Sequence, residues 1–229
     1  MTGADAALAA RLSSVREGIA RAAEAAGRDP AGITLVVVTK FHPVDLVRRL
    51  VDLGVTDVGE NRHQEAQEKA AVLAAEGVPV TWHFVGQVQG KKARQIARYA
   101  DVIHSVDRER LVGELSATGR DLDCFLQVNL TDDPARGGVA PDELEPLARA
   151  AAGAEALRVR GLMAVAPLGE DPAAAFRRLG GYAQRLREIV PGATDLSAGM
   201  SHDYPQAIAA GATHLRIGTA ITGNRPAPR

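Results

Sequence analysis

The sequence predicts an α/β fold, a (β/α)8 TIM barrel with one extra helix at its N-terminus. Eight short apolar segments rich in β-branched residues alternate with amphipathic helical segments, a pattern typical of a parallel sheet covered by helices. The 229 residues, 46% of them hydrophobic, suit one domain of this kind. A doubly wound open sheet is the alternative. It is less favoured because no Gly-x-Gly-x-x-Gly turn follows the first strand.

The first expected element is a helix over about residues 5–27, in which apolar side chains from Leu8 to Ile19 recur at helical spacing and Gly27 supplies a stop. The barrel is expected over about 33–223, within a single domain of residues 1–229 that ends in a short tail, 224–229. The expected strands are 33–40, 56–61, 80–86, 101–107, 123–130, 157–167, 194–201 and 213–220. The expected helices between them are 44–53, 65–75, 91–99, 109–117, 142–152, 173–189 and 204–210.

Composition argues against several classes of function. The formal net charge of -1 provides no electrostatic footprint for nucleic acid. No segment has the apolar length of a membrane span, and the first residues lack the pattern of a signal peptide. Cys124 is the only cysteine, so neither an internal disulfide nor a cysteine metal cluster is expected. No paired histidine motif indicates a metal site, and we expect a cytoplasmic protein.

Lys40 is the most informative single residue. It closes the apolar run LVVVT, at the strand end where active sites of such barrels lie. Partial desolvation there would favour the neutral amine, which can attack an aldehyde. A lysine that merely extends to solvent from a strand end is the simpler interpretation. The other lysines, Lys69, Lys91 and Lys92, lie in helical segments and are expected to be exposed, solvated charges.

Two segments near the C-terminus have the composition of a phosphate site. Gly199-Met200-Ser201 and Gly218-Thr219 follow the last two strands, where barrels of this class often bind phosphate. Glycines allow backbone N–H groups to approach an anion, and a helix that starts near Tyr204 could direct its N-terminus at it. Tight turns alone would also explain the glycines. For other polar strand-end residues, such as His104 and Asn129, exposure to water is the favoured explanation.

Taken together, these segments resemble the YggS/PROSC family of pyridoxal phosphate homeostasis proteins. The resemblance covers about residues 4–223. The segments that carry it are VVVTK ending at Lys40, VGENRHQE (58–65), WHFVGQVQGKKAR (82–94), HSVDR (104–108), RGLMAV (160–165), LSAGMSHDY (196–204) and AIAAGATHLRIGTAITG (207–223).

The resemblance implies a fold-type III barrel, like the N-terminal domain of alanine racemase, that binds pyridoxal 5′-phosphate (PLP). Lys40 matches the lysine of the internal aldimine. The other matching positions are Asn61 in the cofactor pocket, Arg216 facing the pyridine nitrogen, Ser201, Gly218 and Thr219 in the phosphate cradle, and Met200 and His83 lining the pocket.

Several positions depart from the family pattern, among them Gln87-Val88-Gln89-Gly90 and His202. Relatives commonly have Ser-Lys-Thr where this chain has Thr39-Lys40-Phe41. Many have lysine where this chain has Arg136. Because arginine stays protonated, an auxiliary cofactor-carrying role at position 136 is not expected.

The implied function is intracellular homeostasis of PLP without robust catalysis. Racemisation needs two positioned acid/base groups, and no counterpart of the tyrosine on the second racemase domain is evident. An arginine at the ring nitrogen also weakens the cofactor as an electron sink. PLP, and PLP-dependent apo-enzymes that receive it, are the expected partners of a monomer. A racemase-like PLP enzyme and a PLP-free class I aldolase, in which Lys40 attacks a keto-phosphate, remain the alternatives.

Overall fold

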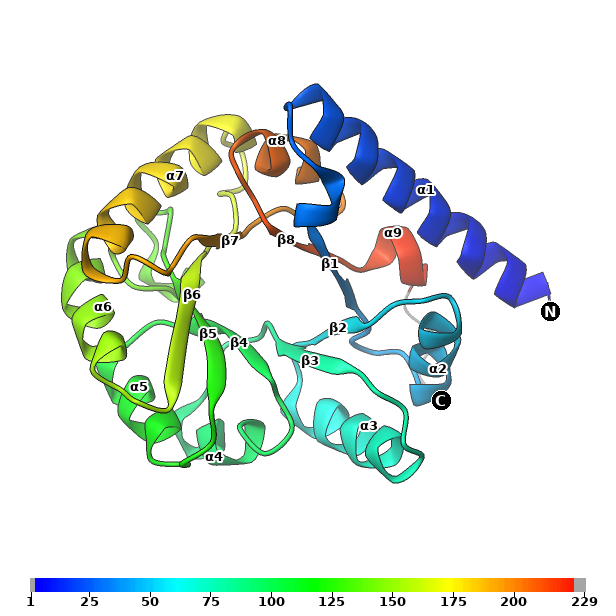
Figure 1. Cartoon of the computed structure of the whole chain (residues 1–229), viewed down its shortest axis with the longest axis horizontal. Helices are drawn as coiled ribbons and strands as arrows, with labels where there is room; N and C mark the ends of the chain where they lie inside the picture. Colours follow the sequence, from blue (N-terminus) through cyan, green and yellow to red (C-terminus); the bar gives the residue numbers. More distant parts are fainter. Residues whose placement is uncertain (1–2, 225–229) are drawn as a thin grey trace.

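The computed structural model describes residues 3–224, which form a closed barrel of eight parallel strands surrounded by helices (Figure 1). Each strand pairs with its neighbour in sequence, and β8 pairs with β1 to close the sheet. This confirms the predicted fold class. The strands are β1 Thr34–Val38, β2 Asp57–Glu60, β3 Thr81–Phe84, β4 Val102–Val106, β5 Leu122–Gln127, β6 Leu157–Met163, β7 Asp195–Ser197 and β8 His214–Ile217.

Among the described residues, the first eight helices follow the predicted order and the last one was not predicted. The helices are α1 Gly3–Ala25, α2 Val44–Asp52, α3 His63–Ala75, α4 Ala93–Ile96, α5 Glu109–Ser116, α6 Leu144–Ala152, α7 Pro172–Ile189, α8 Tyr204–Ala209 and α9 Thr219–Thr222, with short 3-10 turns η1 Pro30–Gly32, η2 Gly90–Lys92, η3 Pro134–Arg136 and η4 Pro141–Glu143. Among the described residues, no helix combines the length and apolar character that a membrane crossing requires.

Element boundaries differ from the sequence prediction at several places. The last expected strand, 213–220, ends at Ile217, because Gly218 turns the chain (φ -111°, ψ -93°) into α9. The expected helix 91–99 is the turn η2 followed by the short helix α4. Of the predicted tail 224–229, all but Asn224 lies outside the described residues.

Two layers of side chains fill the molecule. Val37 and Val58 are fully buried against the helices, whereas the adjacent strand positions Val36 and Gly59 face the barrel interior, as strand alternation requires. Val36 Cγ1 lies so near Gly59 that a Cβ there would be only 3.0 Å away. Inside the barrel, apolar packing is limited, and polar side chains occupy much of the remaining space.

The extra helix α1 lies along α8 and α9 on one side of the barrel (Figure 1). Hydrogen bonds from its arginine side chains connect α1 to the segment that runs from α8 to α9. Arg11 Nε donates to Ile221 O at 2.7 Å, and Arg28 donates to Ile208 O and Ala212 O. The predicted N-terminal helix is therefore part of the folded domain, and its contacts support the segment that follows β8.

Candidate cofactor site

The carboxyl-terminal mouth of the barrel brings together most of the residues predicted from sequence. Lys40 lies two residues beyond β1, Asn61 follows β2, Ser201 follows β7 and Gly218 follows β8. Since β8, β1 and β2 are neighbours, their ends meet at one edge. Thr219, in the first turn of α9, and Met200, which is 39% exposed, lie at the same mouth.

Lys40 occupies a tight turn with unusual backbone geometry. His42 N donates to Thr39 O at 3.1 Å, so Lys40 and Phe41 are the two central residues of the turn. Phe41 has φ +68° and is the one non-glycine described residue with a positive φ. A positive φ at this position is the feature of a type II turn, where glycine is usual. For a phenylalanine it costs roughly 1–3 kcal/mol, and such strain tends to occur at functional sites.

Arg216 extends within the barrel below this mouth. It is 6% exposed, and its guanidinium donates to Ser197 Oγ at 2.6 Å and to Ala164 O at 2.9 Å. No carboxylate of the described residues lies within ion-pair distance of it. Burial lowers the pKa of Arg216 to about 10, which leaves it charged at neutral pH. If PLP binds here, a buried cation held only by neutral acceptors would favour an uncharged pyridine nitrogen over a protonated one.

A chain of polar contacts connects Arg216 to the opposite wall of the barrel. His104 Nδ1 lies 2.7 Å from Ser197 Oγ, and His104 Nε2 lies 2.9 Å from His83 Nδ1. His83 Nε2 in turn lies 2.9 Å from Asp57. Burial, the nearby His83 and the charge of Arg216 lower the pKa of His104 well below its usual value, so this ring is neutral.

These contacts change the interpretation of the two histidines. His104 is completely buried, so the expectation that it is a solvent-exposed strand-end residue is wrong. His83 was expected to line the cofactor pocket. Both of its ring nitrogens contact protein groups, and it lies deeper in the barrel, where His104 connects it to Ser197. Among the predicted residues, it is the one that lies away from the others.

The three other lysines are not alike. Lys69, on α3, was expected to be exposed, but it is 6% exposed and its Nζ lies 2.6 Å from Glu60 Oε1. That prediction is wrong because α3 packs its Lys69 face against β2 and the end of β1. Lys69 Nζ also donates to Thr39 O at 3.0 Å. Lys91 is exposed and Lys92 partly so, as expected.

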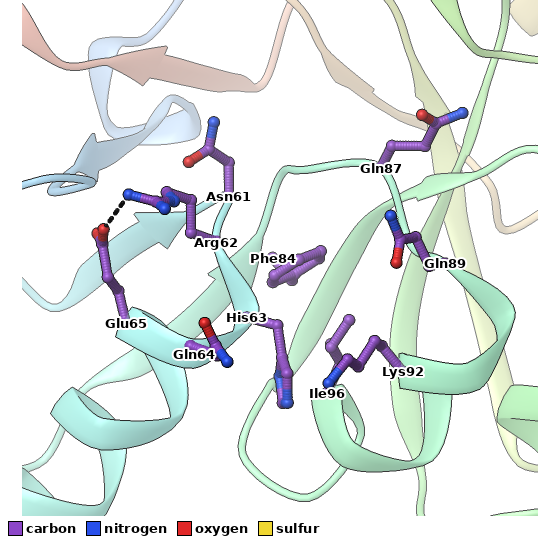
Figure 2. A pocket seen from close by; sticks show the side chains of 10 residues that line it. All are labelled: Asn61, Arg62, His63, Gln64, Glu65, Phe84, Gln87, Gln89, Lys92 and Ile96. Atoms are coloured by element: carbon purple, nitrogen blue, oxygen red, sulfur yellow. Dashed lines mark hydrogen bonds and ion pairs between the residues drawn. The ribbon is translucent and has the colours of Figure 1, made fainter.

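A pocket of about 350 Å³ opens beside Asn61, between the start of α3 and the turn η2 (Figure 2). Arg62, His63, Glu65 and Lys92 contribute to its polar lining. Asn61 Oδ1 is buried and accepts no hydrogen bond from the described residues. An acceptor left without a partner at the barrel mouth fits a site that a polar ligand completes.

The loop after β7, one of the two candidate phosphate loops, packs tightly against α8. Gly199 has φ +92°, and a Cβ there would lie 2.7 Å from Ala207 Cβ. Met200 N donates to the Asp203 carboxylate at 2.6 Å, which fixes the loop before α8. A backbone this close to α8 admits only glycine at position 199. α8 begins at Tyr204, as predicted, but spans only six residues.

Arg136 ends the turn η3 and lines a separate pocket of about 150 Å³ with Gln127 and Val165. Gly86, after β3, contacts the loop of Asn61 so closely that a Cβ would lie 2.4 Å from Asn61 O. Sequence reasoning missed Gly86, Ser197 and Glu60. In residues 3–224, no group of three or more His, Cys, Asp or Glu side chains is arranged to hold a metal ion.

Comparison with known proteins shows the family to which the chain belongs. Residues 10–226 match the family described as alanine racemase, N-terminal domain, and the chain belongs to that family. Alanine racemase from Corynebacterium glutamicum has the same fold, with a TM-score of 0.67 at 17% identity. The match covers 94% of this chain and 62% of that one.

Within this class, the chain is similar to pyridoxal phosphate homeostasis proteins along nearly its whole length. It is 42% identical to that of Pseudomonas aeruginosa over 225 residues (95% of this chain and 96% of the relative). It is 41% identical to that of Corynebacterium glutamicum over 210 residues (87% and 93%). PipY of Synechococcus elongatus, solved with PLP bound, matches with 36% identity and a TM-score of 0.80, covering 94% of this chain and all of that one.

Proposed function

We propose that this protein binds PLP covalently through Lys40 and serves the homeostasis of PLP. The observation that carries the proposal is the position of Lys40, in a strained turn at the end of β1, beside the loops after β7 and β8. The likeness to PLP homeostasis proteins and to PLP-bound PipY supports the same ligand. When bound, PLP supplies an electrophilic aldehyde carbon, which the amine of Lys40 would mask.

The other residues would bind the remaining parts of the cofactor. Ser201, Gly218 and Thr219 lie where hydroxyls and backbone N–H groups could hold its phosphate. Arg216 would face the pyridine nitrogen and donate to it. Asn61 supplies a buried oxygen that lacks a partner. Met200 would border the open side. His83 would contribute indirectly, by orienting His104 against the Ser197 hydroxyl that Arg216 also contacts.

We further propose that the protein is a carrier and not an efficient enzyme. Racemisation would need a second acid/base group opposite Lys40, and Tyr99 and Tyr204 both contact other groups. The Tyr99 ring stacks on His63, and its hydroxyl lies 3.4 Å from His63 Nδ1. The hydroxyl of Tyr204 faces Gly18 of α1, where a Cβ would lie 2.2 Å away. Arg216 would keep the ring nitrogen unprotonated, which limits carbanion chemistry.

Reduction with borohydride followed by peptide mapping tests the ligand and the lysine together. Protein loaded with PLP should show a visible absorbance band, and reduction should leave the pyridoxyl group on the peptide that contains Lys40. Recovery of the label on Lys69, Lys91 or Lys92 in its place would refute the assignment. Rapid, Lys40-dependent loss of deuterium from an α-deuterated amino acid would refute the carrier role. A protein that stays colourless with PLP, yet is trapped by borohydride with a keto-phosphate, would indicate an aldolase.

The proposed carrier acts as a cytoplasmic monomer that supplies PLP to apo-enzymes. The single cysteine, Cys124, is buried and unpaired, which is compatible with a reducing compartment. Light scattering of the loaded protein should give a mass near 24 kDa. Mixing it with a PLP-dependent apo-enzyme should restore that enzyme's activity faster than spontaneous dissociation of PLP allows.

A further inference from the structure

We propose that Glu65 and the Lys69–Glu60 ion pair are positioning residues for Lys40, because they hold the peptide groups on either side of it. This inference rests on the proposed function, in which Lys40 carries PLP. The three side chains come from β2 and α3, and none of them was predicted as a site residue from sequence.

The peptide group before Lys40 is held from the helix side. Thr39 O accepts from Lys69 Nζ at 3.0 Å, and Thr39 Oγ1 donates to Glu60 Oε1 at 2.7 Å. Glu60, Lys69 and Thr39 are all buried, with at most 6% exposure. Charged hydrogen bonds shielded from water are the stronger ones, so the backbone at Thr39 has little freedom to rotate.

The peptide group after Lys40 is held by one carboxylate. Phe41 N donates to Glu65 Oε2 at 2.9 Å. The other oxygen, Glu65 Oε1, accepts from Arg62 at 2.7 Å, the contact drawn at the edge of the pocket in Figure 2. The Arg62 guanidinium also lies 5.3 Å from the centre of the Phe41 ring. Glu65 and Arg62 therefore hold the main chain and the side chain of Phe41 together.

The positive φ of Phe41 explains why such contacts are needed. A phenylalanine relaxes readily to negative φ when nothing opposes it, and that change would rotate the peptide that joins it to Lys40. The hydrogen bond from Phe41 N to Glu65 opposes this rotation, while Lys69 fixes the preceding carbonyl. The backbone of Lys40 is thereby held in one conformation at the barrel mouth before any ligand arrives. Its side chain leaves the turn in one direction, which reduces the ordering required for covalent attachment.

Glu65→Ala is the decisive variant, and the rate at which the visible band grows after mixing with PLP is the measurement. We expect this rate to fall about tenfold, the effect of losing one charge-assisted hydrogen bond. Glu65→Gln keeps an acceptor for Phe41 N and should restore most of the rate. Glu68→Ala, at an exposed position of the same helix, is the matched control and should leave the rate unchanged.

Binding of pyridoxine 5′-phosphate separates positioning of Lys40 from general damage to the pocket. This compound carries an alcohol where PLP carries its aldehyde, so it cannot bond to lysine. If Glu65 acts through Lys40, Glu65→Ala should leave the affinity for this compound within about twofold of the parent protein. An equal loss of affinity for both compounds would overturn the inference.

Phe41→Gly tests the role of strain independently. Glycine adopts a positive φ without steric cost, so the turn no longer depends on Glu65. The effect of Glu65→Ala should therefore be several-fold smaller when Phe41 is replaced by glycine than in the parent chain. Equal effects in the two backgrounds would show that Glu65 does not stabilise this turn.

Lys40→Ala separates a failure of the proposed function from a failure of the positioning role alone. If this variant still forms the visible band with PLP, the proposed function fails and the inference fails with it. If it loses the band, while Glu65→Ala attaches PLP at the parental rate, the proposed function stands and only the positioning role is refuted.

Discussion

The hydroxyl of Ser197 lies between His104 and Arg216, 2.7 Å from the imidazole and 2.6 Å from the guanidinium. Through this hydroxyl, the neutral ring of His104 orients the buried guanidinium of Arg216. Because Arg216 donates to Ser197, the hydroxyl proton is free to point at His104. This arrangement fixes where the guanidinium lies beneath the barrel mouth.

Ser197→Ala should loosen Arg216 and destabilise the protein. The substitution removes an acceptor from a buried charged donor, which costs about 1–3 kcal/mol. Urea unfolding at pH 7.5 measures this loss. Ser13→Ala, on the exposed side of α1, should change the free energy of unfolding by less than about 0.5 kcal/mol. Equal stability of the two variants would contradict the proposed link.

Arg216→Glu should change the absorbance spectrum of the PLP-loaded protein. A carboxylate facing the pyridine nitrogen favours its protonation, whereas a guanidinium opposes it. The milder Arg216→Gln removes the charge without adding a new one and should give a smaller shift. Arg21→Glu, at an exposed position, serves as the control. If both Arg216 variants give the same spectrum as the parent protein, Arg216 does not face the pyridine nitrogen.

The buried histidines should make the fold sensitive to acid. Burial lowers the pKa of His214 to about 4, and that of His104 falls well below its usual value. Between pH 6.5 and about 4 the unfolded chain binds protons that the folded chain excludes, so these histidines make stability fall as the pH is lowered. Glu60, whose pKa is raised by burial, opposes this trend.

A variant isolates the histidine contribution. His214→Gln should flatten the decline in unfolding free energy between pH 6.5 and about 4, because glutamine binds no proton there. His202→Gln, at an exposed position, should leave the slope unchanged. Parallel pH profiles for the parent and His214→Gln would show that His214 is protonated equally in both states.

Lys69→Met should destabilise the protein strongly. It leaves the Glu60 carboxylate buried without its counter-ion, a change that costs about 3–5 kcal/mol. The loss should be smaller at pH 5 than at pH 7.5, since protonation of Glu60 relieves it. The double variant Lys69→Met/Glu60→Leu should recover much of the stability. A single variant as stable as the parent would mean that the pair is not buried in solution.

Gly86→Ala should displace Asn61 and weaken PLP binding. The added Cβ would lie 2.4 Å from Asn61 O and 2.8 Å from its Cα, so one of the two loops has to move. Gly113→Ala, in α5 where nothing lies within 4 Å of the new methyl, is the control and should leave binding intact. Normal affinity for PLP in Gly86→Ala would show that the position of Asn61 is unimportant.

The sequence by itself determined the barrel and the edge at which the candidate site lies. Runs such as LVVVT before Lys40 alternate with amphipathic helices, and this pattern depends only on local hydrophobicity and backbone preference. The carboxyl ends of parallel strands meet at one mouth, so Lys40, Asn61, Ser201 and Gly218 could be assigned to it from strand order. The end of the last strand was predicted wrongly, because residues 219–220 follow Gly218, which turns the chain into α9.

Only the tertiary structure decided what surrounds Lys40 and Arg216. Lys69 and Glu60 are nine residues apart in the chain, and neither residue type suggests burial. Packing of α3 against β2 removes both from water and makes them an ion pair. His104 and Ser197 are separated by 93 residues and meet only because the barrel closes. Contacts of this kind depend on the three-dimensional path of the chain, which local sequence patterns do not encode.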